Sequence, residues 1–257
     1  MTTAQNLTRP DGETLAFHAR QPAADRAGGP TVVWFGGFKS DMTGTKATAL
    51  DDWAKARGQG FVRFDYFGHG ASSGRFEDGT IGRWLDDGLH VLRELAPGPV
   101  VLVGSSMGGW LSLLAARALQ AEGDRLKGMV LIAPAPDFTQ ALMWEGFSNE
   151  IRKQIMEEGE YRQPSDYDDE PYIITRQLID EGRDHLIMDK PIPVTCPVRI
   201  LQGMRDEDVP WQHAMRLVDA LEGDDVTFTL VKAGDHRLST PGDIARLHDV
   251  LDEVVSG

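Results

Sequence analysis

The sequence predicts an α/β protein in which helices cover both faces of a mostly parallel central sheet. Short apolar, β-branched runs end at turn residues, and stretches with helical spacing of apolar residues lie between them. Strands that alternate with helices form parallel sheets, because each crossover helix returns the chain to the same edge. In such sheets the ligand crevice lies beyond the carboxyl ends of the strands. The residues that directly follow each strand are therefore the first candidates for chemistry.

Six short runs are predicted to be buried strands. They cover residues 31–35, 61–66, 100–103, 129–133, 198–201 and 226–231. Apolar residues recur with the spacing of a helix in three of the connecting stretches, which are 81–95, 110–118 and 244–254. Together these elements indicate one continuous domain, because no repeat or linker interrupts them.

Residues 134–194 break the alternation. They place 61 residues between two predicted strands, whereas a strand-helix-strand connection needs about half that length. We interpret this interval as an inserted helical lid, with residues 1–133 and 195–257 forming the core. Within it, 137–158 and 170–186 have helical patterns and a turn-rich piece lies around 164–166.

Composition excludes several classes of protein. The chain has 26 Lys and Arg against 40 Asp and Glu, a formal charge of −14, which is the wrong sign for binding nucleic acid. No apolar stretch approaches the roughly 20 residues of a membrane span, so no stable membrane insertion is expected. Residues 1–12 lack the pattern of a secretory or transit peptide, which predicts a cytoplasmic protein. The single cysteine, Cys196, is expected to be a small core residue.

A serine motif stands between a predicted strand and a predicted helix. Residues 104–109 read Gly-Ser-Ser-Met-Gly-Gly, which is the G-x-S-x-G nucleophile elbow in its required context. Gly104 and Gly108 flank a residue whose strained backbone leaves no room for neighbouring side chains. The register selects Ser106, because a nucleophile at Ser105 would need glycines at positions 103 and 107. The alternative is a glycine-serine turn without catalytic meaning.

A serine hydroxyl becomes nucleophilic only when a histidine accepts its proton and an acid orients that histidine. Asp206 follows the strand predicted at 198–201, and His236 follows the strand predicted at 226–231. The chain order of serine, acid and histidine is the one found with this type of elbow. We therefore predict Ser106, Asp206 and His236 as a catalytic triad.

Other acids and histidines are alternatives for these roles. Asp208 lies two residues beyond the preferred loop position, and Asp235 adjoins the base itself. His69 precedes the serine in the chain and is expected in a turn, with Asp65 as a carboxylate that stabilises the same turn. The remaining candidates fall in predicted helices or in the predicted lid, where surface or packing roles are expected: His90, His185, His213 and His248.

A tetrahedral oxyanion requires two amide donors that are in place before the reaction. The first expected donor is the backbone N–H of Met107, the residue after the nucleophile, at the positive end of a helix. The second is the N–H of Phe38, because the glycines at 36 and 37 let the loop 36–41 pass close to the elbow. The alternative is that this loop is only a structural turn.

No cofactor or metal ion is expected. The histidines are not accompanied by a His-x-x-x-His or clustered carboxylate pattern. The elbow lacks the G-x-G-x-x-G spacing and the Gly-Lys-Ser/Thr ending of phosphate-binding loops.

The chain resembles the serine α/β-hydrolases, and more narrowly the α/β-hydrolase domain-containing protein ten group of mitochondrial acyl-protein thioesterases and their bacterial relatives. It departs from that group in showing no mitochondrial leader and in matching least within the lid. The resemblance rests on these segments: Gly36-Gly37-Phe38, Gly44-Thr45-Lys46-Ala47, Arg63-Phe64-Asp65-Tyr66, Gly104 to Trp110, Pro191 to Pro197, Gly203-Met204 with Asp206, Val209-Pro210-Trp211 and Asp235-His236-Arg237.

The resemblance implies hydrolysis of palmitoyl or other acyl thioesters on cysteine, and of acyl-glucuronide esters. It carries over Ser106, Asp206 and His236 as the triad and makes an S-acylated protein a candidate partner. A carboxylesterase or lactonase for small uncharged esters is the alternative within the same class. A signalling protein that captures a ligand without turnover, and whose lid contacts a partner, is the alternative from another class.

The charge of the predicted lid bears on the substrate. Residues 134–194 contain 14 acids and 6 bases. An acidic entrance would repel anionic substrates at low salt and tolerate neutral esters or basic protein surfaces. The alternative is a solvated face that only aids solubility. The sequence does not indicate the acyl chain length or the oligomeric state.

Overall fold

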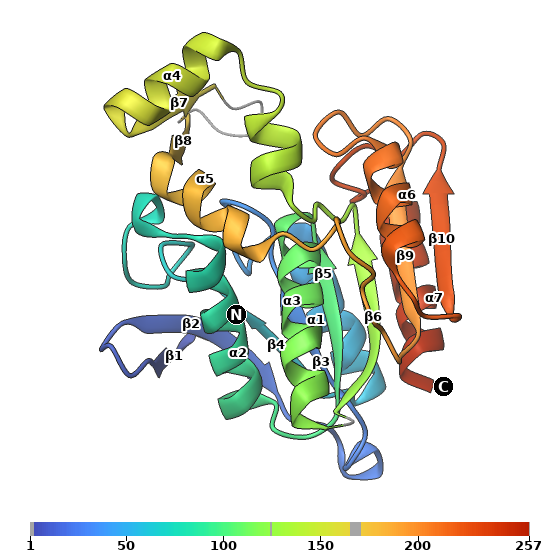
Figure 1. Ribbon diagram of the computed structural model, residues 1–257. Helices are drawn as coiled ribbons and strands as arrows, with labels where there is room; N and C mark the ends of the chain where they lie inside the picture. Colours follow the sequence, from blue (N-terminus) through green and yellow to red (C-terminus); the bar gives the residue numbers. More distant parts are fainter. Residues whose placement is uncertain (1–2, 124, 165–170, 257) are drawn as a thin grey trace.

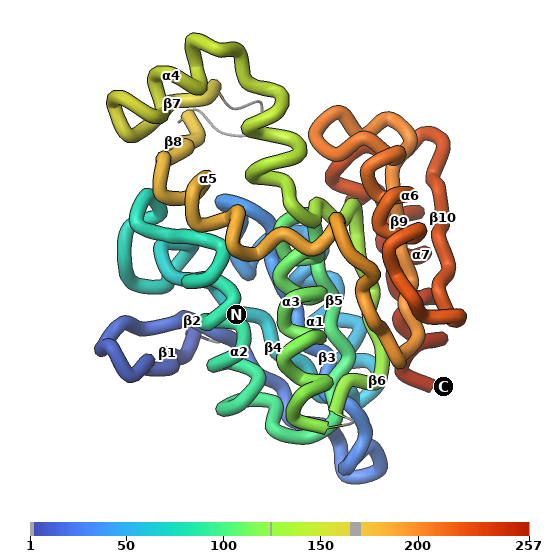
Figure 2. Tube along the Cα trace, in the orientation of Figure 1, coloured from blue at the N-terminus to red at the C-terminus, as the bar shows by residue number. Residues whose placement is uncertain are grey.

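The computed structural model describes residues 3–123, 125–164 and 171–256. A sheet of eight strands forms its centre, and Figures 1 and 2 show how the chain is arranged around it. Its strand order is β1-β2-β4-β3-β5-β6-β9-β10. The pairs β1–β2 and β2–β4 are antiparallel, and the other neighbours are parallel. The strands are β1 (Gln5–Thr8), β2 (Thr14–Arg20), β3 (Thr31–Phe35), β4 (Phe61–Phe64), β5 (Val100–Ser105), β6 (Leu126–Ile132), β9 (Val198–Gly203) and β10 (Val226–Val231). The predicted fold class is confirmed.

Helices cover both faces of this sheet. The helices α2 (Ile81–Leu95), α3 (Met107–Glu122) and α6 (Trp211–Ala220) pack on one face, and α1 (Thr45–Arg57) and α7 (Pro241–Ser256) pack on the other. The alternation of side chains along β5 shows the two layers: Val100 and Leu102 contact the first group of helices, and Val101 and Val103 contact the second. All four side chains are fully buried, which is why the strand reads as a continuous apolar run.

Sequence patterns identified six strands of the sheet and the helices α2, α3 and α7, and they missed two elements near the N-terminus. The helix predicted at 81–95 is α2, whose N-cap Thr80 accepts a hydrogen bond from the Arg83 amide. The edge hairpin β1–β2 and the helix α1 were not predicted. The helix α1 follows Gly44 without a side-chain cap, and two of its four buried residues are alanines, Ala47 and Ala54. Its apolar periodicity is therefore weak.

The chain between β6 and β9 lies at the carboxyl ends of the parallel strands, at the top of Figure 1. Its elements are the π-helical turn η3 (Thr139–Trp144), α4 (Asn149–Glu158), the hairpin β7 (Glu160–Gln163) and β8 (Tyr172–Thr175), α5 (Arg176–Gly182) and the 3₁₀ turn η4 (Arg183–His185). Helical structure was predicted in both parts, but the hairpin was not, because four-residue strands carry little periodicity. Of the predicted turn 164–166, residues 165 and 166 lie outside the described residues.

A buried carboxylate joins the two ends of this segment. Asp137, which has a φ of 59°, accepts hydrogen bonds of 2.9 Å from the amides of both Ile187 and Met188. Burial raises its pKa, and the two amide donors lower it. The segment therefore begins and ends at one fixed point on the core.

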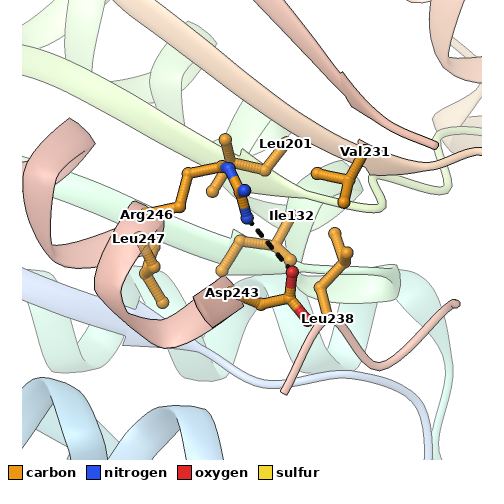
Figure 3. A pocket seen from close by; sticks show the side chains of 7 residues that line it. All are labelled: Ile132, Leu201, Val231, Leu238, Asp243, Arg246 and Leu247. Carbon is orange, nitrogen blue, oxygen red and sulfur yellow. Dashed lines mark hydrogen bonds and ion pairs between the residues drawn. The ribbon is translucent and has the colours of Figure 1, made fainter. Parts of the chain in front are cut away.

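A small gap in the packing lies on the face covered by α7 (Figure 3). Its volume of about 10 Å³ is that of about one water molecule. Apolar side chains line most of it, and the ion pair between Asp243 and Arg246, at 3.2 Å, forms its polar side. It is too small for a substrate.

Two further sequence expectations concern the core and the membrane. Cys196 is buried, as expected for a core residue. Within the described part of the chain, no helix combines the length and the hydropathy that a membrane crossing requires.

Candidate active site

The residue predicted as nucleophile stands at a sharp turn between β5 and α3. Ser106 has φ 54° and ψ −118°, an unfavourable conformation for a residue with a Cβ atom. Its amide donates to the Ile132 carbonyl at 2.9 Å, and its carbonyl accepts from the amides of Gly109 and Ala135 at 2.8 and 3.1 Å. These three hydrogen bonds hold the strained residue in place.

The glycines around Ser106 are required by close backbone contacts. A Cβ atom on Gly104 would lie 2.3 Å from the Gly108 carbonyl oxygen, and one on Gly108 would lie 2.0 Å from that of Phe35. Both distances are far below van der Waals contact, so any side chain would force β5, α3 and β3 apart. The spacing of the motif thus reflects the tight packing of these three elements.

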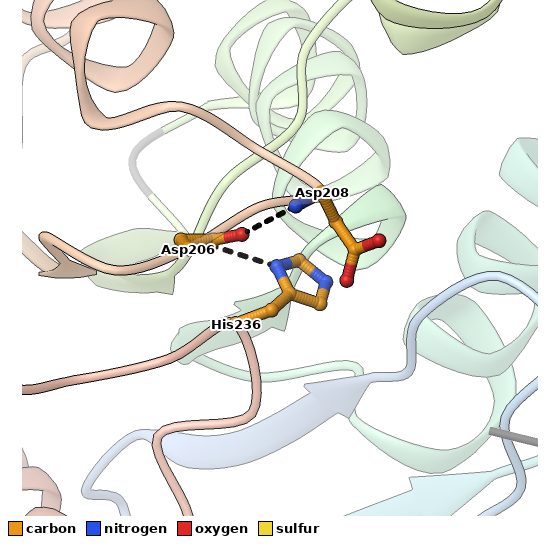
Figure 4. A group of neighbouring side chains, drawn as sticks. All are labelled: Asp206, Asp208 and His236. Carbon is orange, nitrogen blue, oxygen red and sulfur yellow. Dashed lines mark hydrogen bonds and ion pairs between the residues drawn. The ribbon is translucent and has the colours of Figure 1, made fainter. Parts of the chain in front are cut away.

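His236 and Asp206 form a hydrogen-bonded pair (Figure 4). Nδ1 of His236 lies 2.9 Å from Oδ2 of Asp206, whose side chain is fully buried. The other carboxylate oxygen accepts from the amides of Asp208 and Val209, at 3.0 and 2.8 Å, and Gln202 Nε2 donates to Oδ2 at 3.0 Å. A carboxylate that accepts from Nδ1 leaves Nε2 of the neutral ring without a proton, which is the form that a general base needs.

The alternative acids have other contacts. Oδ1 of Asp235 accepts a hydrogen bond of 2.9 Å from the Leu238 amide within its own turn. The backbone amide of Asp208 donates a hydrogen bond to Asp206. One ligand atom from each of the side chains of Asp206, Asp208 and His236 lies within 4.8 Å of the other two. In the part of the chain that the structure describes, these three side chains form the group that could hold a metal ion. Because Nδ1 and both Asp206 oxygens already have hydrogen-bond partners, the group fits an acid–base pair better than a metal centre.

The loop after β3 passes directly beside the elbow. A Cβ atom on Gly37 would lie 3.6 Å from Cβ of Ser106. The Gly37 carbonyl accepts from the amide and from Oγ of Ser40, at 3.2 and 2.8 Å. A trans peptide directs its C=O and N–H to opposite sides, so the Phe38 N–H points away from Ser40. Met107 opens α3, and the amides of a first helical turn have no partner within the helix.

A cavity of about 670 Å³ brings most of the predicted site residues together. Ser106, His236, Phe38 and Met107 all line it, and Asp206 lies behind His236. Its size is typical of small-molecule sites. Among the seven histidines, which are all described, His236 is the one that lines it. The arrangement can deliver a serine hydroxyl, a base and amide donors to one ligand.

The walls of the cavity contain residues that sequence reasoning did not assign. The chain between β6 and β9 supplies an apolar wall: Phe138, Leu142, Met143, Phe147 and Tyr172. On the polar side lies Lys46, whose ammonium group donates to the carbonyl of Arg237, the residue after His236. Burial and the nearby Arg237 together lower the pKa of Lys46 to about 8, although nearby acids act in the opposite direction. The segment Gly44-Thr45-Lys46-Ala47, one of those that carry the family resemblance, was the sequence signal that could have pointed to Lys46.

Comparison with known proteins identifies the family. The family model described as "Alpha/beta hydrolase family" matches residues 28–247. The chain belongs to the alpha/beta hydrolase family. The resemblance drawn from its motifs is therefore confirmed.

Close relatives of this alpha/beta hydrolase share nearly its whole length. Mouse palmitoyl-protein thioesterase ABHD10, a mitochondrial protein by name, is 40% identical over 227 residues, which are 88% of this chain and 75% of the relative. A solved structure of a bacterial hydrolase from Agrobacterium vitis has a TM-score of 0.93 and 47% identity, covering 99% of this chain and 98% of the other. The solved mouse alpha/beta hydrolase domain-containing protein 10 has a TM-score of 0.89 and 36% identity, covering 99% of both chains.

The comparison corrects the predicted location of this alpha/beta hydrolase. The cytoplasmic prediction is wrong, because the mammalian relatives are mitochondrial proteins by name. The prediction used the composition of residues 1–12. Targeting segments lie outside the folded domain and are removed after import, so residues of the domain itself carry no information about the compartment.

Proposed function

We propose that this protein is a serine hydrolase that cleaves acyl thioesters or oxygen esters through an acyl-enzyme on Ser106. The observation that carries the proposal is the convergence of the strained elbow serine and the His236–Asp206 pair on one cavity. The names of the mammalian relatives, palmitoyl-protein thioesterases, favour long acyl chains attached to a protein cysteine.

The proposed reaction proceeds in two halves. Oγ of Ser106 attacks the acyl carbonyl while Nε2 of His236 takes its proton, and Asp206 stabilises the imidazolium that forms. The amides of Phe38 and Met107 donate to the oxyanion. His236 then protonates the departing thiol or alcohol, and an acyl group remains on the serine. Water activated by the same histidine hydrolyses this ester and restores the free enzyme.

The apolar wall of the cavity supports an acyl subsite. Ala135 and five large apolar or aromatic side chains from the chain between β6 and β9 line the cavity that contains Ser106. We propose that residues 134–194 act as the lid over a core of residues 1–133 and 195–257, with the acyl chain beneath this wall. Burying each methylene would contribute about 0.8 kcal/mol, so longer chains gain affinity until the wall ends.

The test compares matched p-nitrophenyl esters and S-acyl thioesters of two to sixteen carbons, with Ser106→Ala as the inactive control. We expect turnover of both series, a rise of kcat/KM with chain length, and a loss of about a million-fold in kcat in the variant. An S-palmitoylated peptide tests whether a protein cysteine is the natural leaving group. Activity that persists in Ser106→Ala would contradict the proposal.

The same measurement separates the alternatives. A preference for short oxygen esters would identify a small-molecule carboxylesterase or lactonase. One acylation without further turnover, detected as a stable mass increase on Ser106, would identify a protein that captures its ligand.

A further inference from the structure

His69 lies beneath the loop that follows β3, and its side chain is almost completely buried. Its Nδ1 is 3.1 Å from the Phe67 carbonyl oxygen, and its Nε2 is 3.2 Å from the backbone nitrogen of Lys39. A carbonyl only accepts and an amide N–H only donates. These contacts place the ring proton on Nδ1 and make Nε2 an acceptor. Burial lowers the pKa of His69 to about 4, which keeps the ring neutral near pH 7.

The amide that donates to His69 is that of Lys39, which lies in a strained part of the loop. Lys39 has a φ of 54°, the left-handed region that residues with a Cβ atom avoid. The peptide group before Phe38 is held by its Gly37 carbonyl, which accepts hydrogen bonds from the amide and Oγ of Ser40. Phe38 therefore lies between two peptide groups that are each fixed by a hydrogen bond. The direction of its N–H depends on both.

The aromatic rings around His69 also contact the Phe38 ring. Phe76 and Trp84 each place their ring centroids 5.1 Å from that of His69. The same two rings lie 4.9 and 5.9 Å from the Phe38 ring. Edge-to-face contacts at these separations are favourable and directional. A displaced imidazole would disturb both the backbone and the side chain of Phe38.

We propose that His69 is a positioning residue that holds the Phe38 amide where the oxyanion of the tetrahedral intermediate forms. The inference rests on the proposed hydrolase function. His69 does not line the cavity, so it acts on the reaction only through the loop. An amide donor contributes most when it is in place before charge develops, because no reorganisation is then needed.

The test replaces the acceptor while keeping the packing. His69→Phe retains a ring against Phe76 and Trp84 but has no acceptor, and His69→Leu is a second variant of that kind. His69→Gln is the matched rescue, because its amide oxygen can accept from Lys39. For each variant we would measure kcat and KM on one p-nitrophenyl ester, with active sites counted by fluorophosphonate labelling. Inhibition by an alkyl boronic acid, which forms a tetrahedral adduct with serine, gives an independent readout.

We expect His69→Phe and His69→Leu to lower kcat per active site roughly 10- to 100-fold, somewhat less than the removal of an oxyanion donor. Boronate affinity should fall in the same proportion, while KM changes by less than about threefold, since uniform binding is unaffected. His69→Gln should recover most of the loss. A merely structural role would reduce the number of active sites and leave kcat per site unchanged.

Two results obtained with folded variants would overturn the inference. One is an unchanged kcat per labelled site in either variant without an acceptor. The other is a loss in His69→Gln equal to that in His69→Phe, with boronate affinity unaffected. If neither variant without an acceptor folds while His69→Gln is fully active, the imidazole is a core residue and the inference is wrong. A wild-type protein that neither hydrolyses esters nor binds the boronate would contradict the proposed function itself.

Discussion

At the scale of single residues, the candidate site depends on hydrogen bonds that orient its groups. Asp206 accepts four hydrogen bonds, from the His236 ring, the Gln202 amide and two backbone amides. Only one of these bonds goes to the base. The other three hold the carboxylate in the orientation that meets Nδ1 of His236. They also compensate for the hydrogen bonds to water that the carboxylate loses when it is buried.

Replacing Asp206 should show which acid serves the histidine. Asp206→Asn should lower kcat about 10³- to 10⁴-fold, because an amide can donate to Nδ1 and leave the proton on Nε2. Asp208→Asn is the matched control and should retain activity within about tenfold, because the Asp206–His236 bond remains. The measurement is kcat/KM on one ester at pH 7. The reverse order of the two variants would assign the acid to Asp208.

At the scale of elements, the candidate site lies where three tightly packed elements meet the chain between β6 and β9. The elbow joins β5 to α3 under the end of β3, and the distances at Gly104 and Gly108 leave no room for a side chain. Asp137, near the start of the chain between β6 and β9, accepts hydrogen bonds from the amides of Ile187 and Met188 near its end. The packing at the elbow and the hydrogen bonds of Asp137 both hold together segments that are far apart in the sequence.

Adding one methyl group at the elbow should destabilise the protein. Gly108→Ala places a Cβ atom 2.0 Å from the Phe35 carbonyl oxygen. The backbone must shift to remove this clash, which should lower the free energy of unfolding by about 3 kcal/mol or more. Gly98→Ala is the control, since nothing lies within 4 Å of its Cβ position, and it should change the free energy of unfolding by less than about 0.5 kcal/mol. Urea denaturation measures both. Equal stability of the two variants would contradict the packing argument.

Removing the Asp137 carboxylate should loosen the chain between β6 and β9. Asp137→Ala loses both hydrogen bonds and keeps a φ of 59° that alanine disfavours. We expect limited proteolysis to cut within residues 134–194 at least about tenfold faster than in the wild type, since opening then costs less free energy. Asp137→Asn, which tolerates this backbone conformation, should lie between the two. An unchanged cleavage rate in Asp137→Ala would show that other contacts hold the segment.

At the scale of the whole molecule, the parallel sheet brings distant loops to one edge. The loops after β3, β5, β9 and β10 supply Phe38, Ser106, Asp206 and His236, which span some 200 residues of sequence. The same layers bury ionisable groups whose pKa values differ from those of the unfolded chain. Burial raises the pKa of Asp87 to about 6 and lowers that of His69 to about 4.

Acid should weaken the folded state through His69. The folded-state pKa is depressed from 6.5 to about 4, so its contribution is present above pH 6.5 and is lost as the pH falls to about 4. At about 1.4 kcal/mol per pKa unit, the loss amounts to about 3 kcal/mol. The gap in free energy of unfolding between wild type and His69→Gln should narrow by this amount between pH 7 and 4. Asp87 acts in the opposite direction, but it is present in both proteins and cancels in the difference.

Features with local signals could be predicted from the amino-acid sequence alone. The glycines of the elbow and the apolar runs of the central strands follow from adjacent residues. The chain order of Ser106, Asp206 and His236 and the family follow from short motifs placed after separate strands. These signals are strong because a strained turn and a fully buried strand restrict residue types at known spacings.

Tertiary structure decided what depends on contacts between distant segments. The hairpin β7–β8 is formed by packing of Tyr161 and Tyr172 on a small apolar cluster, and the place of Lys46 beside Arg237 joins residues 191 positions apart. His69 reads as a turn residue in the sequence, and only the fold brings Nε2 to the Lys39 amide. No spacing rule anticipates such contacts, because each depends on how two separately predictable elements pack together.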